Sequence, residues 1–262
     1  MSAIARNNVK ISGSGSRPIL FAHGFGCDQS MWRHVAPRFE DAFRVVAFDH
    51  VGAGGSDSKA YDPAKYATLS GYASDVVEIG EELDIQNGIL VGHSVSAMIG
   101  ALASIERPDM FSTLVMVGPS PRYIDDTGYE GGFSADDIED LLASLADNPL
   151  AWSASMAPVI VGNPDRPEHG QELADSICKL DPAIANGFAR ATFTSDNRDD
   201  LPKVSARTLI LQCRDDIIAS EHVGAYVRDK IQGSQLVMLN ASGHCPNLTA
   251  PAEVVAAIRN FL

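Results

Sequence analysis

Short apolar runs alternate with segments of helical period along much of this chain. Apolar runs bounded by glycine, proline or polar residues are typical of buried strands. The runs expected to form strands are Pro18 to Ala22, Arg44 to Phe48, Gly88 to Val91, Thr113 to Val117, Thr208 to Cys213 and Leu236 to Leu239, with Asn8 to Ser12 as a short antiparallel entry strand. Helices are expected at Gln29 to Phe39, Leu69 to Leu83, Ala97 to Ile105 and Ile217 to Tyr226. This alternation predicts the α/β class, with a mainly parallel sheet and helices on both faces.

The alternation stops at about Pro119 and returns only at Arg207. Between them the pattern predicts about four helices, Asp136 to Ala146, Pro149 to Val161, Glu172 to Leu180 and Ile184 to Phe193. We therefore expect residues 119–200 to form a helical cap inserted into a core made of residues 1–118 and 201–262. A cap over the carboxyl edge of a sheet excludes water and shapes a pocket.

Phe25 of the loop after the first buried strand, together with aromatic and sulfur side chains of the cap, is a candidate to line that pocket. The candidates are Phe25, Phe133, Trp152, Met156, Phe188 and Phe193. Aromatic residues at helical spacing also pack inside a helical layer, so only part of this set is expected to face the cavity. Arg122 and Tyr123, at the start of the cap, fit a hinge surface equally well.

Composition and charge narrow the function. A chain of 262 residues with 45% hydrophobic content can bury one sizeable α/β core. The formal charge of −14 argues against nucleic acid as a partner, because phosphates would be repelled. No run of eighteen apolar residues predicts a membrane span, and residues 1–6 lack the apolar segment of a secretory signal, so we expect a cytoplasmic location.

Cysteines, histidines and glycines show no pattern of a metal or nucleotide site. The four cysteines lack metal-ligand spacing and are expected to be free thiols, with Cys27 and Cys245 near enough to the site loops for sensitivity to thiol reagents. The segment Gly52 to Ser56 lacks the lysine of a phosphate-binding loop. His34, His50, His169 and His222 are most simply surface or loop residues. We expect no metal and no cofactor.

Ser94 lies where an apolar strand turns into a helix, in Val91-Gly92-His93-Ser94-Val95-Ser96. Such a turn strains the serine backbone and holds its hydroxyl clear of the sheet, which is the nucleophile elbow of serine hydrolases. Ser96 replaces the usual second glycine of this pattern, and serine is small enough for the position. The pattern predicts Ser94 as a nucleophile that attacks a carbonyl carbon.

A serine nucleophile needs a base, and the base needs an acid. His244 follows the strand at Leu236 to Leu239, and Asp215 and Asp216 follow the strand at Thr208 to Cys213. The order serine, acid, histidine is that of α/β-hydrolases. Asp216 is favoured as the acid because it stands further from the strand end, and Asp215 is the alternative.

The oxyanion formed by serine attack requires two backbone N–H donors. Val95, which follows the nucleophile, supplies one. The loop His23-Gly24-Phe25-Gly26 after an early strand supplies the other, which we assign to Phe25. His23 is expected to tie neighbouring loops together, and His93 to pack or to hydrogen-bond on the far side of the elbow.

Several segments resemble one family. Phe21 to Trp32 looks like the oxyanion loop of the RsbQ-like α/β-hydrolases, bacterial stress-signalling proteins related to the strigolactone and karrikin receptors of plants. Gly92 to Gly100 is similar to the elbow of the plant karrikin receptors, where serine is also familiar at the position of Ser96. Further similar segments are Met116 to Pro121, Gly162 to Glu168, Ile210 to Ile218 and Gly243 to Pro246. In that family the acid falls four residues after the strand glutamine, which here is Asp216.

Two functions follow from these observations. The predicted triad points to a hydrolase of a small, mostly apolar ester or lactone by an acyl-enzyme mechanism. The resemblance implies an alternative, a regulator in a general stress response whose partner is a sensor-domain phosphatase and for which partner binding outweighs turnover.

Overall fold

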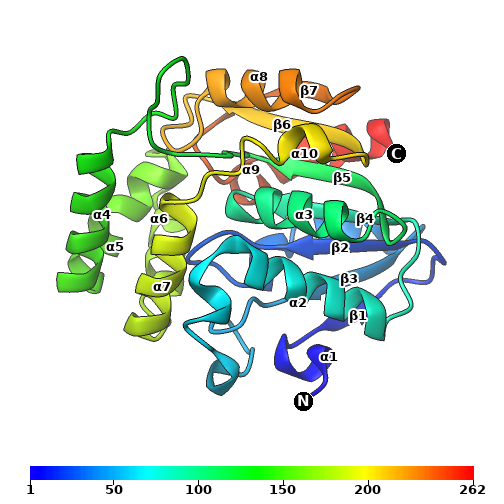
Figure 1. Ribbon diagram of the computed structural model, residues 1–262. Helices are drawn as coiled ribbons and strands as arrows, with labels where there is room; N and C mark the ends of the chain where they lie inside the picture. Colours follow the sequence, from blue (N-terminus) through cyan, green and yellow to red (C-terminus); the bar gives the residue numbers. More distant parts are fainter.

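The computed structural model describes all 262 residues and contains one seven-stranded sheet in the order β1-β3-β2-β4-β5-β6-β7 (Figure 1). The strands are β1 (Lys10–Ser12), β2 (Pro18–Ala22), β3 (Arg44–Phe48), β4 (Gly88–His93), β5 (Phe111–Val117), β6 (Arg207–Arg214) and β7 (Gln235–Ser242). Only β1 runs antiparallel to its neighbour, β3, while every other pair is parallel. The mainly parallel sheet and its short antiparallel entry strand are confirmed.

Helices cover both faces of this sheet because alternate side chains of each strand point to opposite sides. In β2, Leu20 and Ala22 join the apolar cluster beneath α2 (Leu69–Glu82), α3 (Val95–Glu106) and α8 (Glu221–Lys230). Ile19 and Phe21 join the opposite cluster, beneath α10 (Pro251–Phe261) and the 3₁₀ turns η1 (Gln29–Trp32) and η2 (Ala36–Phe39). The short remaining elements are α1 (Ala3–Arg6), α9 (Pro246–Thr249), η3 (Ser58–Ala60), η4 (Lys65–Ala67) and η5 (Leu201–Lys203).

Four helices lie between β5 and β6 in the chain and stand beside the sheet (Figure 1). They are α4 (Ala135–Asp147), α5 (Pro149–Val161), α6 (Pro167–Ile177) and α7 (Pro182–Phe193), and we call them the helical insertion. Three of them begin with proline, which suits the first turn because that N–H has no intrahelical partner. Their apolar cluster includes Cys27, Met31, Ile218 and Cys245 from loops of the core. The insertion therefore shares its packing with the carboxyl edge of the sheet.

Two helix predictions are wrong in detail. Gln29 to Phe39 forms the separate turns η1 and η2 rather than one helix, and Pro37, which lacks an N–H, breaks continuity there. The helix expected from Ile217 begins only at Glu221, because the Asp216 carboxylate accepts hydrogen bonds from the amides of Ile218 and Ala219. None of the helices is both long and apolar enough to cross a bilayer.

Candidate active site

Ser94 occupies the tight turn between β4 and α3, with φ 56° and ψ −125°. A residue with a side chain adopts positive φ only when its surroundings enforce it. A Cβ on Gly92 would lie 2.2 Å from the carbonyl oxygen of Ser96, so only glycine allows the strand and helix to approach so closely. The amide of Ser94 also donates to the carbonyl of Val117 on β5 (2.8 Å), which fixes the turn against the sheet.

The loops after β6 and β7 bring two further side chains to this turn. The Nε2 atom of His244 lies 2.7 Å from the hydroxyl oxygen of Ser94, and its Nδ1 atom lies 2.8 Å from Oδ2 of Asp216. All three side chains are buried. The arrangement is a continuous chain from hydroxyl through imidazole to carboxylate.

The two candidate acids take different positions. Asp216 points at the imidazole, and its second oxygen accepts from the amides of Ile218 (2.9 Å) and Ala219 (3.0 Å). Asp215 is exposed, has φ 52°, and approaches only the hydroxyl of Ser242. Of the two aspartates, only Asp216 has the contact with His244 that the acid of the predicted triad requires.

The surroundings of Asp216 favour the charged form of its carboxyl group. Burial by itself raises the pKa of Asp216, but attraction to His244 and hydrogen bonds from His244, Ala219 and Ile218 outweigh it, so the net pKa lies below its ordinary value. Asp216 is therefore a carboxylate at neutral pH and accepts the Nδ1–H of His244. With that hydrogen on Nδ1, the Nε2 atom of His244 can accept the hydrogen of the Ser94 hydroxyl.

The backbone of His244 is held from two sides. Its carbonyl accepts from Nε2 of His93 (2.7 Å), and its amide donates to the carbonyl of Ile160 on α5 (2.9 Å). Burial and the nearby His244 lower the pKa of His93 to about 3, so His93 is neutral. The expected hydrogen-bonding role of His93 is confirmed, and its partner is the histidine loop.

The helical insertion touches that loop backbone to backbone. Gly162, which ends α5 with φ +61°, and Gly243, with φ +81°, lie against each other. A Cβ on Gly243 would lie 1.9 Å from the carbonyl oxygen of Val161. No other residue type fits this contact without movement of α5 or of the histidine loop.

The two predicted oxyanion donors have free amides. Neither the Phe25 nor the Val95 amide donates a hydrogen bond within the protein, and both residues adjoin Ser94 or line the same cavity. A Cβ on Gly24 would lie 3.2 Å from the Cβ of Ser94, which shows how closely the loop passes the serine.

A cavity of about 30 Å³ lies beside Ser94 and His244, room for about one water molecule. Its walls are mainly apolar, and no carboxylate, lysine or arginine reaches it. Phe25 and Phe193, both among the pocket candidates, line it together with Ile160 and Ile177 of the insertion. A larger ligand requires displacement of these side chains.

The other pocket candidates lie elsewhere. Phe133, Trp152 and Met156 line a separate hollow of about 560 Å³ between α4 and α5, so their assignment to the cavity at Ser94 is wrong. Phe188 stacks on Tyr72 with ring centroids 4.4 Å apart and supports the ring of Phe25 from outside the cavity. The spacing of the aromatic residues indicated which of them share a helix face, but not whether that face turns toward Ser94.

Sequence reasoning missed several buried polar residues. Tyr123 is not hinge surface: it is 1% exposed, its ring packs against Phe193, and its hydroxyl has no hydrogen-bond partner. His50 and His169 are also buried rather than on the surface. The segment after β3, Asp49-His50, was the available signal, because polar residues at the end of a buried parallel strand face the functional edge.

Burial also changes the expectation for the cysteines. Cys27 and Cys245 both line the cavity but are buried, and burial raises the pKa of Cys27 to about 12 and that of Cys245 well above its ordinary value. Thiols are poor nucleophiles at such pKa values, so the expected sensitivity to thiol reagents does not apply to them. Cys178 is exposed. No three His, Cys, Asp or Glu side chains are grouped closely enough to hold a metal ion.

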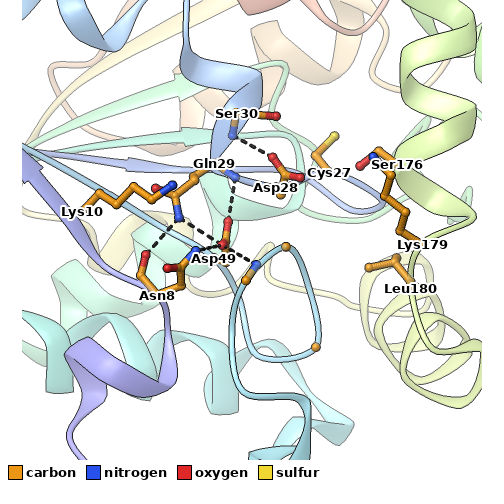
Figure 2. Close-up of a pocket in the computed structure, with 13 residues that line it drawn as sticks. Asn8, Lys10, Cys27, Asp28, Gln29, Ser30, Asp49, Ser176, Lys179 and Leu180 are labelled. Atoms are coloured by element: carbon orange, nitrogen blue, oxygen red, sulfur yellow. Dashed lines mark hydrogen bonds between the residues drawn. The ribbon is translucent and has the colours of Figure 1, made fainter.

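A polar pocket of about 420 Å³ lies beyond Cys27, on the outer side of the oxyanion loop (Figure 2). Asp49, at the end of β3, is its structural centre. Its carboxylate accepts from the amide of Gln29 (2.8 Å), the side chain of Asn8 (2.7 Å) and the amide of Gly55 (2.9 Å). Asp49 thus anchors the far end of the loop that carries Phe25.

Known proteins resemble this chain over nearly its whole length. Residues 19–257 match the model of the Alpha/beta hydrolase family. The karrikin insensitive 2 receptor CA of Petunia hybrida is 40% identical over 253 residues, covering 96% of this chain and 94% of that protein. The strigolactone esterase D14 of Arabidopsis thaliana is 39% identical over 256 residues, covering 97% and 96%. The structure of the hydrolase olei00960 from Oleispira antarctica has a TM-score of 0.96 at 40% identity and covers 99% of this chain and 95% of that one.

Proposed function

Since this chain belongs to the alpha/beta hydrolase family and is a carboxylic ester hydrolase, we propose that it hydrolyses a small, mostly apolar ester or lactone through an acyl-enzyme on Ser94. The single observation that carries the proposal is the buried chain Ser94–His244–Asp216, with 2.7 Å and 2.8 Å between its members. Nucleophile, base and acid are each within proton-transfer or hydrogen-bond distance.

Acylation begins when Nε2 of His244 accepts the hydroxyl proton of Ser94 and the serine oxygen attacks the substrate carbonyl carbon. The carbonyl electron pair moves to oxygen, and the resulting oxyanion accepts hydrogen bonds from the amides of Phe25 and Val95. The tetrahedral intermediate then expels the alcohol oxygen, which takes the proton from His244. In a lactone that alcohol stays attached to the acyl group.

Deacylation repeats these steps with water. His244 accepts a proton from water, the hydroxide oxygen attacks the acyl carbon, and Ser94 leaves with the proton returned by His244. Asp216 stays a carboxylate throughout, because it stabilises the imidazolium and holds the imidazole in the Nδ1–H tautomer. No cofactor takes part.

The substrate class follows from the walls of the cavity. Burial of a charged substrate there would lack a counter-charge and cost several kcal/mol. A small neutral acyl group instead contacts Phe25, Ile177 and Phe193. We assign the helical insertion the role of a cap, within the predicted segment 119–200, whose movement admits the substrate.

The test is hydrolysis of p-nitrophenyl acetate by the wild type and by Ser94→Ala and His244→Ala variants. Turnover is expected to disappear in both variants while thermal unfolding stays cooperative, since these side chains serve the site rather than the core. A folded Ser94→Ala protein that keeps most of its turnover would contradict the mechanism.

A second function, a ligand-processing signalling protein, is favoured by a receptor relative at 40% identity and by the surface of α4. That helix carries acidic side chains, among them Asp136, Asp137 and Glu139, and no basic one. In this proposal a sensor-domain phosphatase, as in the RsbQ-like proteins, docks on α4 in the cytoplasm. Charge reversal at Asp136 and Glu139 is expected to weaken capture of that phosphatase while ester turnover stays unchanged. Equal capture of the phosphatase by the wild type and the charge-reversed variant would contradict docking on α4, and only the hydrolase function would remain.

A further inference from the structure

A closed set of buried hydrogen bonds surrounds the start of the oxyanion loop. Ser96, in the first turn of α3, has its hydroxyl beside the carbonyl oxygen of His23 and 2.7 Å from Nε2 of His50. The amide of His50 lies 3.1 Å from Nε2 of His23, and Nδ1 of His23 lies 2.9 Å from the carbonyl oxygen of Gly24. All three side chains are fully buried.

The direction of each bond follows from which atoms can donate. A carbonyl oxygen only accepts, so the single hydroxyl hydrogen of Ser96 points to the carbonyl of His23. The Ser96 oxygen must therefore accept from Nε2–H of His50. Burial lowers the pKa of His50 well below its ordinary value, so this neutral ring carries no hydrogen on Nδ1, which has no partner.

The same reasoning assigns the tautomer of the His23 ring. The His50 amide donates to Nε2 of His23, so that nitrogen carries no hydrogen. Burial also lowers the pKa of His23, so its one ring hydrogen is on Nδ1 and is donated to the carbonyl of Gly24. Every bond in the set therefore has one allowed direction.

The consequence lies in the next peptide group. The carbonyl of Gly24 and the amide N–H of Phe25 belong to one planar peptide and point in opposite directions. Orientation of the Gly24 carbonyl by His23 therefore also orients the Phe25 N–H. At the far end of the loop, Asp49 holds the amide of Gln29 (Figure 2).

We propose that Ser96 and His50 are positioning residues that, through His23, aim the Phe25 amide at the oxyanion. The inference rests on the proposed Ser94 hydrolase function. Sterically, the position of Ser96 requires only a small side chain. The proposal adds a function for its hydroxyl group. Neither Ser96 nor His50 lines the cavity at Ser94, so their effect on the reaction is indirect.

The experiment compares Ser96→Ala with Ser104→Ala. Ser104 lies on the same helix and is equally buried, but its hydroxyl bonds only to the carbonyl of Ala101 within that helix (2.8 Å). Each variant is measured for thermal unfolding, for kcat and KM on p-nitrophenyl acetate, and for inhibition by propylboronic acid. The anionic tetrahedral boronate on Ser94 places a hydroxyl oxygen where the oxyanion forms, so its affinity reports on the donors.

Ser96→Ala is expected to lower kcat and boronate affinity by about tenfold or more each, with KM nearly unchanged. The reason is that the Phe25 amide, once misdirected, no longer stabilises the oxyanion, which forms only in the transition state. Ser104→Ala is expected to change neither quantity. A folded Ser96→Ala protein with wild-type kcat and boronate affinity would overturn the proposal, as would equal losses in both variants.

A second pair keeps the test decisive if Ser96→Ala does not fold. In His50→Gln the side-chain amide nitrogen replaces the Nε2–H donor, whereas His50→Leu keeps the bulk without the donor. Glutamine is expected to retain clearly more kcat than leucine, and equal activity of the two would contradict the proposal.

Imidazole ¹⁵N NMR separates this inference from the proposed function. In the wild type the hydrogen is expected on Nδ1 of His23 and on Nε2 of His50, and Ser96→Ala is expected to change the His50 signals. The opposite tautomers would refute the network whatever the enzyme hydrolyses. Absence of ester turnover in the wild type, with the expected tautomers observed, would instead refute the hydrolase function alone.

Discussion

The carboxyl edge of the sheet and the helical insertion hold their side chains by different means. Around Ser94, buried polar side chains hydrogen-bond to one another, as in His244 with Asp216 and His50 with Ser96. In the insertion the contacts are mainly apolar, and its ion pairs, such as Arg190 with Glu139, lie at the surface. Paired polar groups in a dry site tolerate few substitutions, whereas apolar packing tolerates changes of similar volume.

The difference implies a division of roles. In the proposed function, the sheet edge determines which bond the protein cleaves, and the insertion determines which ligand enters. The two regions meet at Gly162 and Gly243 and at the hydrogen bond from His244 to Ile160. Substitutions at the edge are therefore expected to change rates strongly, and those in the insertion to change selectivity modestly.

The largest effect is expected for the acid. Asp216→Asn should lower kcat by roughly three to four orders of magnitude, because an amide at this position favours the wrong imidazole tautomer. The exposed Asp215→Asn serves as the matched control and should change kcat little. Steady-state kinetics on p-nitrophenyl acetate decide the ranking, and a larger loss for Asp215→Asn would reverse our assignment.

The next effect is expected where the two regions meet. Gly243→Ala should destabilise the fold by several kcal/mol and lower kcat, since its Cβ collides with the carbonyl of Val161 and displaces the neighbouring His244. Gly233 also has positive φ, +74°, but nothing lies within 4 Å of its added Cβ. Gly233→Ala should therefore cost only about 1 kcal/mol, the backbone strain alone, and leave kcat unchanged. Thermal unfolding and kcat are measured on both, and equal results would show that the contact is unimportant.

A smaller effect concerns selectivity. Phe193→Ala should extend hydrolysis to esters with longer acyl chains, because the ring lines the cavity, and each methylene accommodated is worth about 1 to 3 kcal/mol. Trp152→Ala should reduce stability without altering the chain-length profile, since Trp152 lines the separate hollow. Rates on a p-nitrophenyl ester series give the comparison. A shift of the profile by Trp152→Ala alone would mean that the two hollows join in solution.

The smallest effect is a pH dependence of stability. The folded pKa of His93 is about 3, against an ordinary value of 6.5. Because the unfolded chain takes up the proton first, the free energy of unfolding falls as pH drops below 6.5. His93 should contribute about 2 kcal/mol of that loss by pH 5. His93→Gln keeps a donor for the His244 carbonyl and should show a shallower slope in urea unfolding between pH 7 and 5. The exposed His34→Gln is the control, and an unchanged slope for His93→Gln would contradict the prediction.

Much of the sheet, and the meeting of Ser94, Asp216 and His244, could be predicted because each depends on local order along the chain. The run Arg44–Phe48 matches β3 at both ends, since apolar periodicity and the flanking polar residues mark a buried strand. Ser94, Asp216 and His244 each lie within two residues of the end of such a strand. Parallel strands present their carboxyl ends at one edge, so the sequence already implied that these side chains meet.

Orientation and burial between distant segments were decided only by the tertiary structure. Nothing local to Trp152 or Met156 says which face of α5 turns to Ser94, because both faces of a helix in a helical layer bury apolar residues. His50, assigned to the surface from sequence, becomes a buried partner of Ser96 only when the segment after β3 meets the first turn of α3. The sequence by itself determined which side chains meet at the carboxyl edge of the sheet. The tertiary structure decided which groups orient them, because orientation depends on contacts between residues far apart in the chain.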